Sequence, residues 1–284
     1  MLEPTIQCPQ VSIVFRWGWP PGVNVFSKAK TAATHLSNLT LRHDHKIRVM
    51  NPGARVPVME RLIVPYDDEL DICKKATEGM DLGGFEFRSR PRLGSYGEEQ
   101  EYIERTLVEN PGYILLCDHG LIHFLDMADV PGEAELPQNT VTAKVAFALR
   151  IAKELGVRIM SVRHQNNLGA PVKGMPPQSR ASKTGYVNVK AGVRDMQQMF
   201  FISHDAQSHW RPWNYLEDRA RALDERKVSG PESVALYEGM SVRFHENKLV
   251  KDRYFSQDEW KRNSRILKRE YNVKFKKKFP ECHG

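Results

Sequence analysis

Two apolar runs in the middle of the chain are separated by a short polar turn. Residues 112–127 read GYILLCDHGLIHFLDM, and Asp118, His119 and Gly120 divide the runs. Apolar runs of this length joined by turn residues are typical of the two strands of a β-hairpin. The pattern therefore predicts an antiparallel hairpin over residues 112–127.

A helix and a further strand are predicted after the hairpin. Apolar residues recur at helical spacing over residues 141–155, Asn139 or Thr140 can cap the start of this helix, and Gly156 can end it. The β-branched run VRIMSV, residues 157–162, is typical of a buried strand. These elements together predict a β-β-α-β unit.

A second helix and strand follow. Residues 186–199 carry an apolar stripe at helical spacing, and FFIS, residues 200–203, has the composition of a strand. The pattern is thus α/β, with a mixed sheet in the order β-β-α-β-α-β. Both late strands lead into polar segments, residues 163–167 and 204–213, which we expect at one edge of the sheet, where loops carry function.

The flanks of this core differ from it. Residues 1–98 are rich in Pro and Gly turns and predict an irregular extension with a few strands. Residues 98–109 predict a short helix at the start of the core. We therefore divide the chain into an extension (1–98), an α/β core (99–225) and a basic C-terminal extension (226–284).

Charge is concentrated at the C-terminal end. Residues 251–279 hold eleven Lys or Arg against four acids, so this segment accounts for the whole net charge of +7. Residues 256–271 predict a helix, in which Ser256 and Glu259 form a capping box. Cations interleaved with aromatic rings suit a polyanion such as RNA. A solvated helix end with docked aromatic residues is the alternative interpretation.

Cysteine usage and hydropathy limit the location. Four scattered cysteines without CxxC spacing favour reduced thiols inside a cell. No apolar run reaches the roughly 18 residues of a membrane span, and the first residues carry no strong targeting signal. We therefore predict a soluble or peripheral protein, with no membrane among its partners.

The order of these elements resembles the eleventh protein of the small ribosomal subunit. That family's last strand leaves through an Ile and an Asp, followed by a His and an Arg-Pro pair; here Ile202, Asp205, His209, Arg211 and Pro212 stand in similar order. The resemblance covers roughly residues 112–222. It implies a ribonuclease H-like fold and no catalysis. It also implies a structural protein of the small-subunit platform that binds ribosomal RNA and neighbouring small-subunit proteins. The long extensions resemble those of a mitochondrial ribosome.

The expected RNA interface combines the two polar segments, the cationic loops and the basic C-terminal extension. Its guanidinium, amide and ring groups can bind phosphates and stack on bases. The alternative is that Trp210 and Trp213 cover the sheet while His204 and His209 bond local backbone. The predicted RNA-binding residues are Arg163, His164, Gln165, Asn166, Asn167, Lys173, Arg180, Lys183, His204, His209, Trp210, Arg211, Arg219, Arg221, Lys261, Arg262, Arg265, Lys268, Arg269, Lys274, Lys276, Lys277 and Lys278.

Two enzymatic alternatives stay open. A metal-dependent nuclease of ribonuclease H-like fold needs several converging carboxylates, for which Asp118, Asp126, Asp129 and Asp205 are available. An isochorismatase-like hydrolase would place a cysteine nucleophile after a later strand, but no Cys lies between residues 118 and 281.

Metal-ligating residue types cluster only weakly. Cys117, His119 and His123 flank the predicted turn and would point in different directions, and His43 and His45 fall in the N-terminal extension. We therefore predict no metal and no cofactor.

Overall fold

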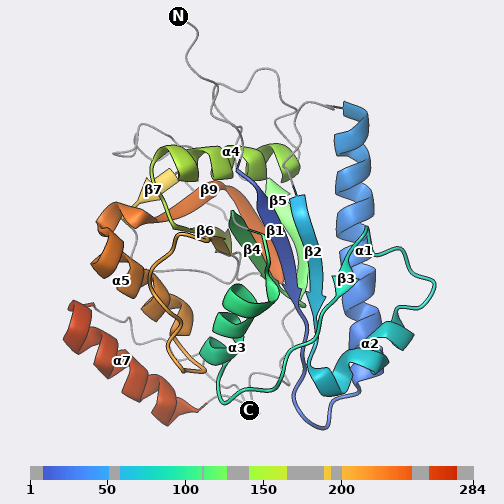
Figure 1. Cartoon of the computed structure of the whole chain (residues 1–284), viewed down its shortest axis with the longest axis horizontal. Coiled ribbons are helices and arrows are strands. Elements are labelled where there is room, and N and C mark those ends of the chain that lie inside the picture. The colour runs from blue at the N-terminus through green and yellow to red at the C-terminus, as the bar shows by residue number, and fades with distance from the viewer. Residues whose placement is uncertain are drawn as a thin grey trace, which may run out of the picture.

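The computed structural model describes residues 9–50, 58–110, 112–126, 141–164, 189–192, 200–244 and 256–273. These residues form a mixed sheet of nine strands. Its order is β3-β2-β1-β4-β8-β6-β9-β5, and β7 pairs with β9 at one side. The α/β class predicted from the sequence is confirmed (Figure 1).

One half of the sheet is parallel and is built around its first strand. β1 (Val11–Arg16) pairs with β2 (Val58–Val64) on one side and with β4 (Tyr113–Asp118) on the other, and the short β3 (Glu86–Phe87) extends beyond β2. The chain moves outward from β1 to β3 and then returns to the other side of β1 to form β4. The strand order therefore reverses between β1 and β4.

The other half mixes strand directions. β8 (Phe200–Ser203) runs antiparallel between β4 and β6 (Ile159–His164), and β6 is parallel to β9 (Val234–Phe244). β5 (Leu121–Asp126) and β7 (Val189–Ala191) both pair antiparallel with β9.

Helices cover both faces of the sheet. Val11 and Phe15 of β1 share one core cluster with α1 (Val25–Met50) and α4 (Val141–Glu154). Val14 of β1 shares the opposite cluster with the π-helical turn η2 (Ile103–Leu107), which continues α3 (Tyr96–Tyr102), and with α5 (Glu217–Ser229). Strands buried on both faces require continuous apolar runs, and this explains the sequences VSIVF and YILLC.

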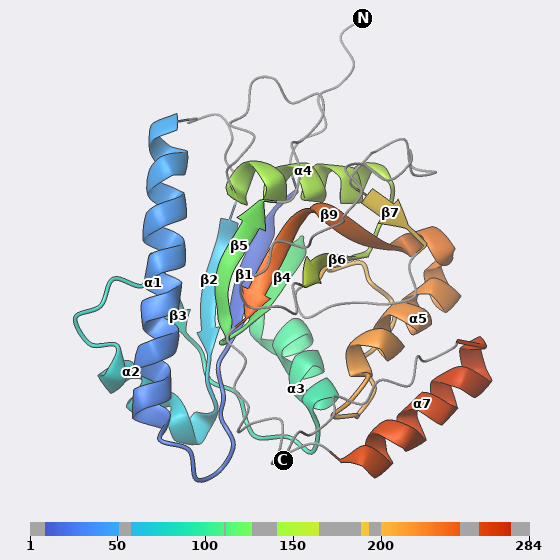
Figure 2. The same cartoon turned by 180° about the vertical axis from the view of Figure 1, so that it is seen from behind.

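The C-terminal helix forms a further layer. α7 (Gln257–Tyr271) packs beside α5 through a small cluster that contains Trp213, Leu223 and Leu267. Figures 1 and 2 show α7 at the margin of the molecule, beyond α5. The remaining short elements are α2 (Leu70–Ala76), η1 (Asp67–Glu69) and η3 (Pro231–Ser233). No helix in the described part of the chain is long and apolar enough to cross a bilayer.

Several local predictions are confirmed. α3 with η2, α4, β6, β8 and α7 lie where the pattern placed them. Gly156 follows α4 with φ of 65°, a conformation that favours glycine. The capping box of α7 forms, since the backbone N–H of Glu259 donates to Oγ of Ser256 at 3.2 Å.

The predicted hairpin over residues 112–127 is wrong. β4 and β5 are both strands, but β4 pairs with β1 and β8, whereas β5 pairs with β9. The apolar run of β4 has all of residues 113–117 buried, which suits a central strand between two neighbours rather than the half-exposed strand of a hairpin.

The predicted helix over residues 186–199 is also wrong where it is described. Val189–Ala191 form β7, and Gly192 follows with φ of 76°. Val189 is fully buried in the strand, a position that suits a β-branched side chain. The rest of that range lies outside the described residues.

The sheet crosses the boundaries drawn at residues 98 and 225. β1, β2 and β3 come from the predicted N-terminal extension, and β9 comes from the predicted C-terminal one. Both segments thus contribute strands to the same sheet as the predicted core.

Candidate functional site

A cavity of about 350 Å³ opens at the carboxyl ends of β1 and β4. Arg16 ends β1, Asp118 ends β4, and both line this cavity. The strand order reverses between these two strands, and in open α/β sheets such a point is where ligands bind. The sheet topology alone therefore makes this cavity the first candidate site.

Arg16 and Asp118 form an ion pair across the two strands. They are register partners, and Nε of Arg16 donates to Oδ1 of Asp118 at 2.9 Å, while Nη2 donates to the same oxygen. Burial would lower the pKa of Arg16, but the Asp118 carboxylate outweighs burial and the pKa is raised. Nη1 of Arg16 is buried and has no hydrogen-bond partner in the described residues. Its N–H groups can therefore donate to an oxygen atom of a ligand.

Two carboxylates enter the cavity from the start of α5. Leu216, just before the helix, has φ of 65°, which is rare for a non-glycine residue and is typical of functional sites. Glu217 and Asp218 follow it and line the cavity. Burial, and then the neighbouring Asp218, raise the pKa of Glu217 well above its ordinary value.

Aromatic and amide side chains complete the wall. Trp210, Tyr215 and Trp260 line the cavity, and Trp260 is supplied by α7. Gln100 of α3 also lines it; this residue is only 4% exposed, and its Oε1 has no partner among the described residues. The cavity thus offers flat apolar surfaces and unsatisfied polar atoms side by side, which is the usual composition of a small-molecule site.

The loop that carries these residues is held from two sides. The backbone N–H of Tyr96 donates to Oδ1 of Asn214 at 3.1 Å, and the backbone N–H of Asn214 donates to Oε1 of Glu259 at 2.9 Å. The loop after β8 is therefore fixed between α3 and α7, and both helices help to shape the cavity.

Arg90 locks the loops that follow β1 and β2. This residue is 1% exposed; its Nη1 donates to the carbonyl oxygen of Trp17 at 2.6 Å and also to that of Val64. Its guanidinium lies 4.2 Å from the ring centroid of Tyr66, whose hydroxyl donates to Glu99 at 3.0 Å. Charge and stacking thus fix the backbone beside the cavity.

Most of the predicted interface in the segment after β8 binds protein instead of solvent. Nδ1 of His209 lies 2.5 Å from Oε1 of Glu101, and Nε1 of Trp210 donates to Glu104 at 2.7 Å. Arg211 binds Asp224 and Glu270 at 2.8 and 2.7 Å. Trp210 and Trp213 are both buried: Trp210 covers the sheet, as the alternative interpretation held, but Trp213 packs between α5 and α7.

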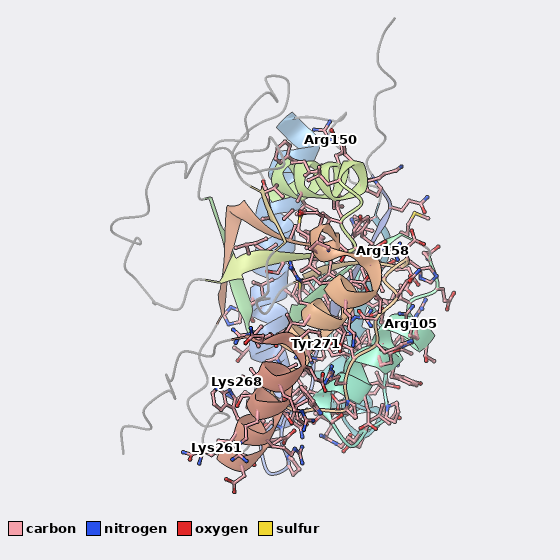
Figure 3. All side chains as sticks on the ribbon, turned by 90° about the vertical axis from the view of Figure 1, so that its left-hand side faces the viewer. Arg105, Arg150, Arg158, Lys261, Lys268 and Tyr271 are labelled. Carbon is pink, nitrogen blue, oxygen red and sulfur yellow. The ribbon has the colours of Figure 1, made fainter. Side chains whose placement is uncertain are left out.

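The other predicted RNA-binding residues lie in several places. Arg221 is fully buried, and its Nη2 lies 2.8 Å from Oε1 of Glu104. Arg219 lies on α5. His204 is exposed after β8 and lines a second cavity. Lys261, Arg262, Arg265, Lys268 and Arg269 are on α7, and Figure 3 labels Lys261 and Lys268. Arg163 and His164 end β6, and their side chains are not described. Outside the described residues lie Gln165, Asn166, Asn167, Lys173, Arg180, Lys183, Lys274, Lys276, Lys277 and Lys278.

Sequence reasoning missed most of the cavity. It did not consider Arg16, Gln100, Glu217 or Asp218, and it treated Asp118 only as a turn residue or a nuclease ligand. A usable signal exists, because the two buried runs VSIVF and YILLC each end in a charged residue. If both are read as parallel strands, their carboxyl ends meet at one edge and bring Arg16 to Asp118.

Metal ligands do not converge in the part of the chain that the structure describes. No group of three or more His, Cys, Asp or Glu side chains there is arranged to hold a metal ion. Asp118 is engaged by Arg16, and burial raises the pKa of Cys117, which keeps its thiol protonated. These residues do not fit a metal centre, and we assign no step to one.

Comparison with known proteins identifies the fold. No protein-family model matches the sequence, and no curated protein matches it. Mannosyl-3-phosphoglycerate synthase from Rubrobacter xylanophilus is similar in structure, with a TM-score of 0.51 and 15% identity over 96% of this chain and 78% of that one. Glucosyl-3-phosphoglycerate synthase from Mycobacterium tuberculosis, solved with Mn²⁺, UDP and glucosyl-3-phosphoglycerate, gives a TM-score of 0.47 and 13% identity over 92% and 80%. TarS from S. aureus, residues 1–349 in complex with UDP-GlcNAc, has a TM-score of 0.47 and 11% identity, over 94% of this chain and 68% of that one.

These findings overturn the ribosomal interpretation. The resemblance to the eleventh small-subunit protein is wrong, and with it the ribonuclease H-like fold, the ribosomal RNA and protein partners, the nuclease alternative and the absence of catalysis. The order of a few strands and an Arg-Pro pair are compatible with more than one α/β fold. The mitochondrial location stays a prediction. The similarity to mannosyl-3-phosphoglycerate synthase shows that this chain shares the fold of that enzyme, the GT-A fold.

Proposed function

We propose that this chain is a glycosyltransferase that binds a nucleotide-diphosphate sugar in the cavity between β1 and β4 and transfers the sugar to an acceptor hydroxyl. One observation carries the proposal: the cavity lies where the strand order of a GT-A sheet reverses, and an arginine–aspartate pair stands at its floor. A ligand with a ring system, hydroxyl groups and phosphates matches its lining.

The chemical groups of such a donor have partners in the cavity. Trp210, Tyr215 and Trp260 offer flat faces for the base and the sugar ring. The unpaired Oε1 of Gln100 accepts a hydrogen bond from a hydroxyl or an amide. Nη1 of Arg16 donates to a phosphate oxygen, in the type of bond that favours arginine at phosphates.

The carboxylates of α5 supply the proton chemistry. In the transfer, the acceptor oxygen bonds to the anomeric carbon, the bond between that carbon and the diphosphate breaks, and the nucleoside diphosphate leaves with the electron pair. The acceptor hydroxyl gives up its proton, and in this proposal Glu217 or Asp218, which line the cavity, takes it. The raised pKa makes the Glu217 carboxylate a stronger base than an ordinary glutamate.

Donor turnover tests the proposal. The wild-type chain is incubated with a panel of nucleotide sugars, and released nucleoside diphosphate is measured with and without divalent cations. We expect release from one donor class, with kcat reduced about 10²- to 10⁴-fold in Glu217→Gln or Asp218→Asn while donor affinity changes little. Lys153→Gln is the matched control, because Lys153 lines the second cavity, beside Tyr113 at the opposite end of β4.

The outcome separates this function from a non-catalytic role of the same fold. Release that depends on Glu217 or Asp218 and is unaffected in Lys153→Gln supports the proposal. Failure of every nucleotide sugar to bind or to turn over would overturn it.

A further inference from the structure

α7 has two faces of opposite chemistry. Its inner face docks on the protein: Asn263 and Leu267 are fully buried, and Nδ2 of Asn263 donates to the carbonyl oxygen of Tyr215 at 3.0 Å. Glu270 extends this docking through its 2.7 Å contact with Arg211. The helix is therefore held in one orientation, which fixes the direction of its other face.

Five cations share the outer face. At 3.6 residues per turn they fall within an arc of about 120°, opposite Asn263 and Leu267. Figure 3 shows two of them, Lys261 and Lys268, on α7 at the edge of the molecule. The five are Lys261, Arg262, Arg265, Lys268 and Arg269.

These cations make few contacts with the rest of the described protein. Within the described residues, Arg262 alone of the five forms an ion pair, with Glu259 at the long distance of 4.0 Å; its Nε also donates to Oδ1 of Asn263 at 3.3 Å, and its side chain is 64% exposed. Lys261, Arg265, Lys268 and Arg269 form no ion pair there. A single acid, Asp258, falls within the arc. The cations therefore form a row of about 12 Å, eight helical rises of 1.5 Å from Lys261 to Arg269, and within the described residues they outnumber the acids of that face five to one.

We propose that the outer face of α7 binds an anionic lipid surface. Four to eight Lys or Arg on an amphipathic helix are typical of segments that bind acidic phospholipid headgroups. Here the apolar side of the helix is already buried in the protein, so binding is electrostatic and does not require insertion. The proposal does not rest on the proposed function.

Charge distribution favours a flat surface and sets the orientation. Residues 251–279 hold the whole net charge of +7, and five of the eleven cations in that segment lie on the outer face of α7, so an anionic surface attracts that face. A straight helix at the margin presents its five cations together to a plane of headgroups. Trp260, on the same helix, lines the candidate cavity, which places that cavity beside the surface when α7 is bound.

The test is vesicle flotation with the full chain. Wild type is mixed with vesicles of phosphatidylglycerol and phosphatidylcholine in equal amounts, or of phosphatidylcholine alone, at low and high salt. The test variant combines Arg262→Gln, Arg265→Gln and Arg269→Gln. The matched control combines Lys30→Gln, Lys74→Gln and Lys75→Gln, three exposed lysines on α1 and α2, and removes the same charge.

We expect wild type to float only with the anionic vesicles and to be released at high salt. Each neutralised cation on α7 lowers affinity about fivefold, so the test variant binds about a hundredfold more weakly. The control variant stays within about threefold of wild type. The lysines after Val273 are present in all three proteins and do not affect the comparison.

Three results overturn the proposal. The first is wild type that does not bind the anionic vesicles. The second is a control variant that loses as much affinity as the test variant, since net charge alone would then explain binding. The third is a single-stranded oligonucleotide that displaces the protein from vesicles at equal phosphate concentration, because α7 would then prefer nucleic acid.

Discussion

Arg16 and Asp118, which are 102 residues apart in the chain, lie opposite each other at the ends of β1 and β4 and are joined by a hydrogen bond of 2.9 Å. The pair spans the two strands between which the strand order reverses. The side chain of Arg16 is 12% exposed and that of Asp118 29%, so the pair is partly shielded from water. It therefore links the packing of the sheet to the chemistry of the cavity.

Asp118→Asn should lower the free energy of unfolding by about 2 kcal/mol, because the shielded Arg16 loses a charge-assisted partner. Urea denaturation with an unchanged m-value measures this. Asp68→Asn is the matched control: Asp68 pairs with Arg92 at 3.0 Å, but its side chain is 63% exposed, and we expect a loss under about 0.5 kcal/mol. Equal losses would show that the Arg16–Asp118 pair is no more than a surface contact.

Glu104 and Arg221 form a buried pair beneath Trp210. Burial raises the pKa of Glu104 and lowers that of Arg221, so the pair remains costly to bury despite its 2.8 Å contact. Glu104→Leu leaves the buried Arg221 with only its 3.9 Å contact to Glu101 and should cost about 3 kcal/mol. Adding Arg221→Met should recover part of that loss, as measured by chemical denaturation. A double variant no more stable than the single one would contradict this account.

Gly97→Ala should disrupt the contact between α3 and the loop after β8. A Cβ at Gly97 would lie 1.7 Å from the backbone oxygen of Arg211, so the backbone has to move. We expect a loss of about 3 kcal/mol together with weaker donor binding, since the same loop lines the cavity. Gly94→Ala is the control, because its Cβ would meet the movable end of the Glu98 side chain at 2.9 Å. Thermal denaturation of both variants checks the difference.

His119 should make stability depend on pH between about 4 and 6.5. Burial lowers its pKa from 6.5 to about 4; the Asp118 charge opposes this, and Arg16, Arg90 and Lys28 add to it. In this range the unfolded chain binds the proton and the folded chain does not, so stability falls as pH falls, by at most about 3 kcal/mol.

His119→Phe keeps a ring beside Trp19, whose ring centroid is 5.3 Å away, and removes the titration. As the pH falls from 6.5 to 4, the unfolding free energy of wild type should fall relative to that of this variant. A difference that does not change with pH would show that His119 is not the cause.

The sequence was sufficient for elements whose signals are local. α4 with Gly156 behind it and α7 with its Ser256 cap were predicted because periodicity and capping residues lie within a few positions of each other. The hairpin failed because strand pairing is not local: β4 and β5 are adjacent in sequence, but each finds its partners elsewhere. β1 and β2 were underrated because Pro and Gly turns surround them.

The site was less predictable than the fold. Arg211 and Trp210 suggest an exposed RNA surface only as long as Asp224 and Glu104 are not seen beside them. These carboxylates lie on other helices, 13 and 106 residues away in sequence, and they convert the apparent interface into interior contacts. Charge composition does not distinguish those cations from the ones on the outer face of α7.

The location of a bound nucleoside diphosphate tests the central claim most directly. A crystal structure of the chain soaked with uridine or guanosine diphosphate would provide it. Our account predicts phosphate oxygens within hydrogen-bond distance of Arg16, in the cavity that Asp118 and Trp260 also line. A nucleotide found instead in the second cavity, beside Arg158 and His204, with the cavity between β1 and β4 unoccupied, would contradict it.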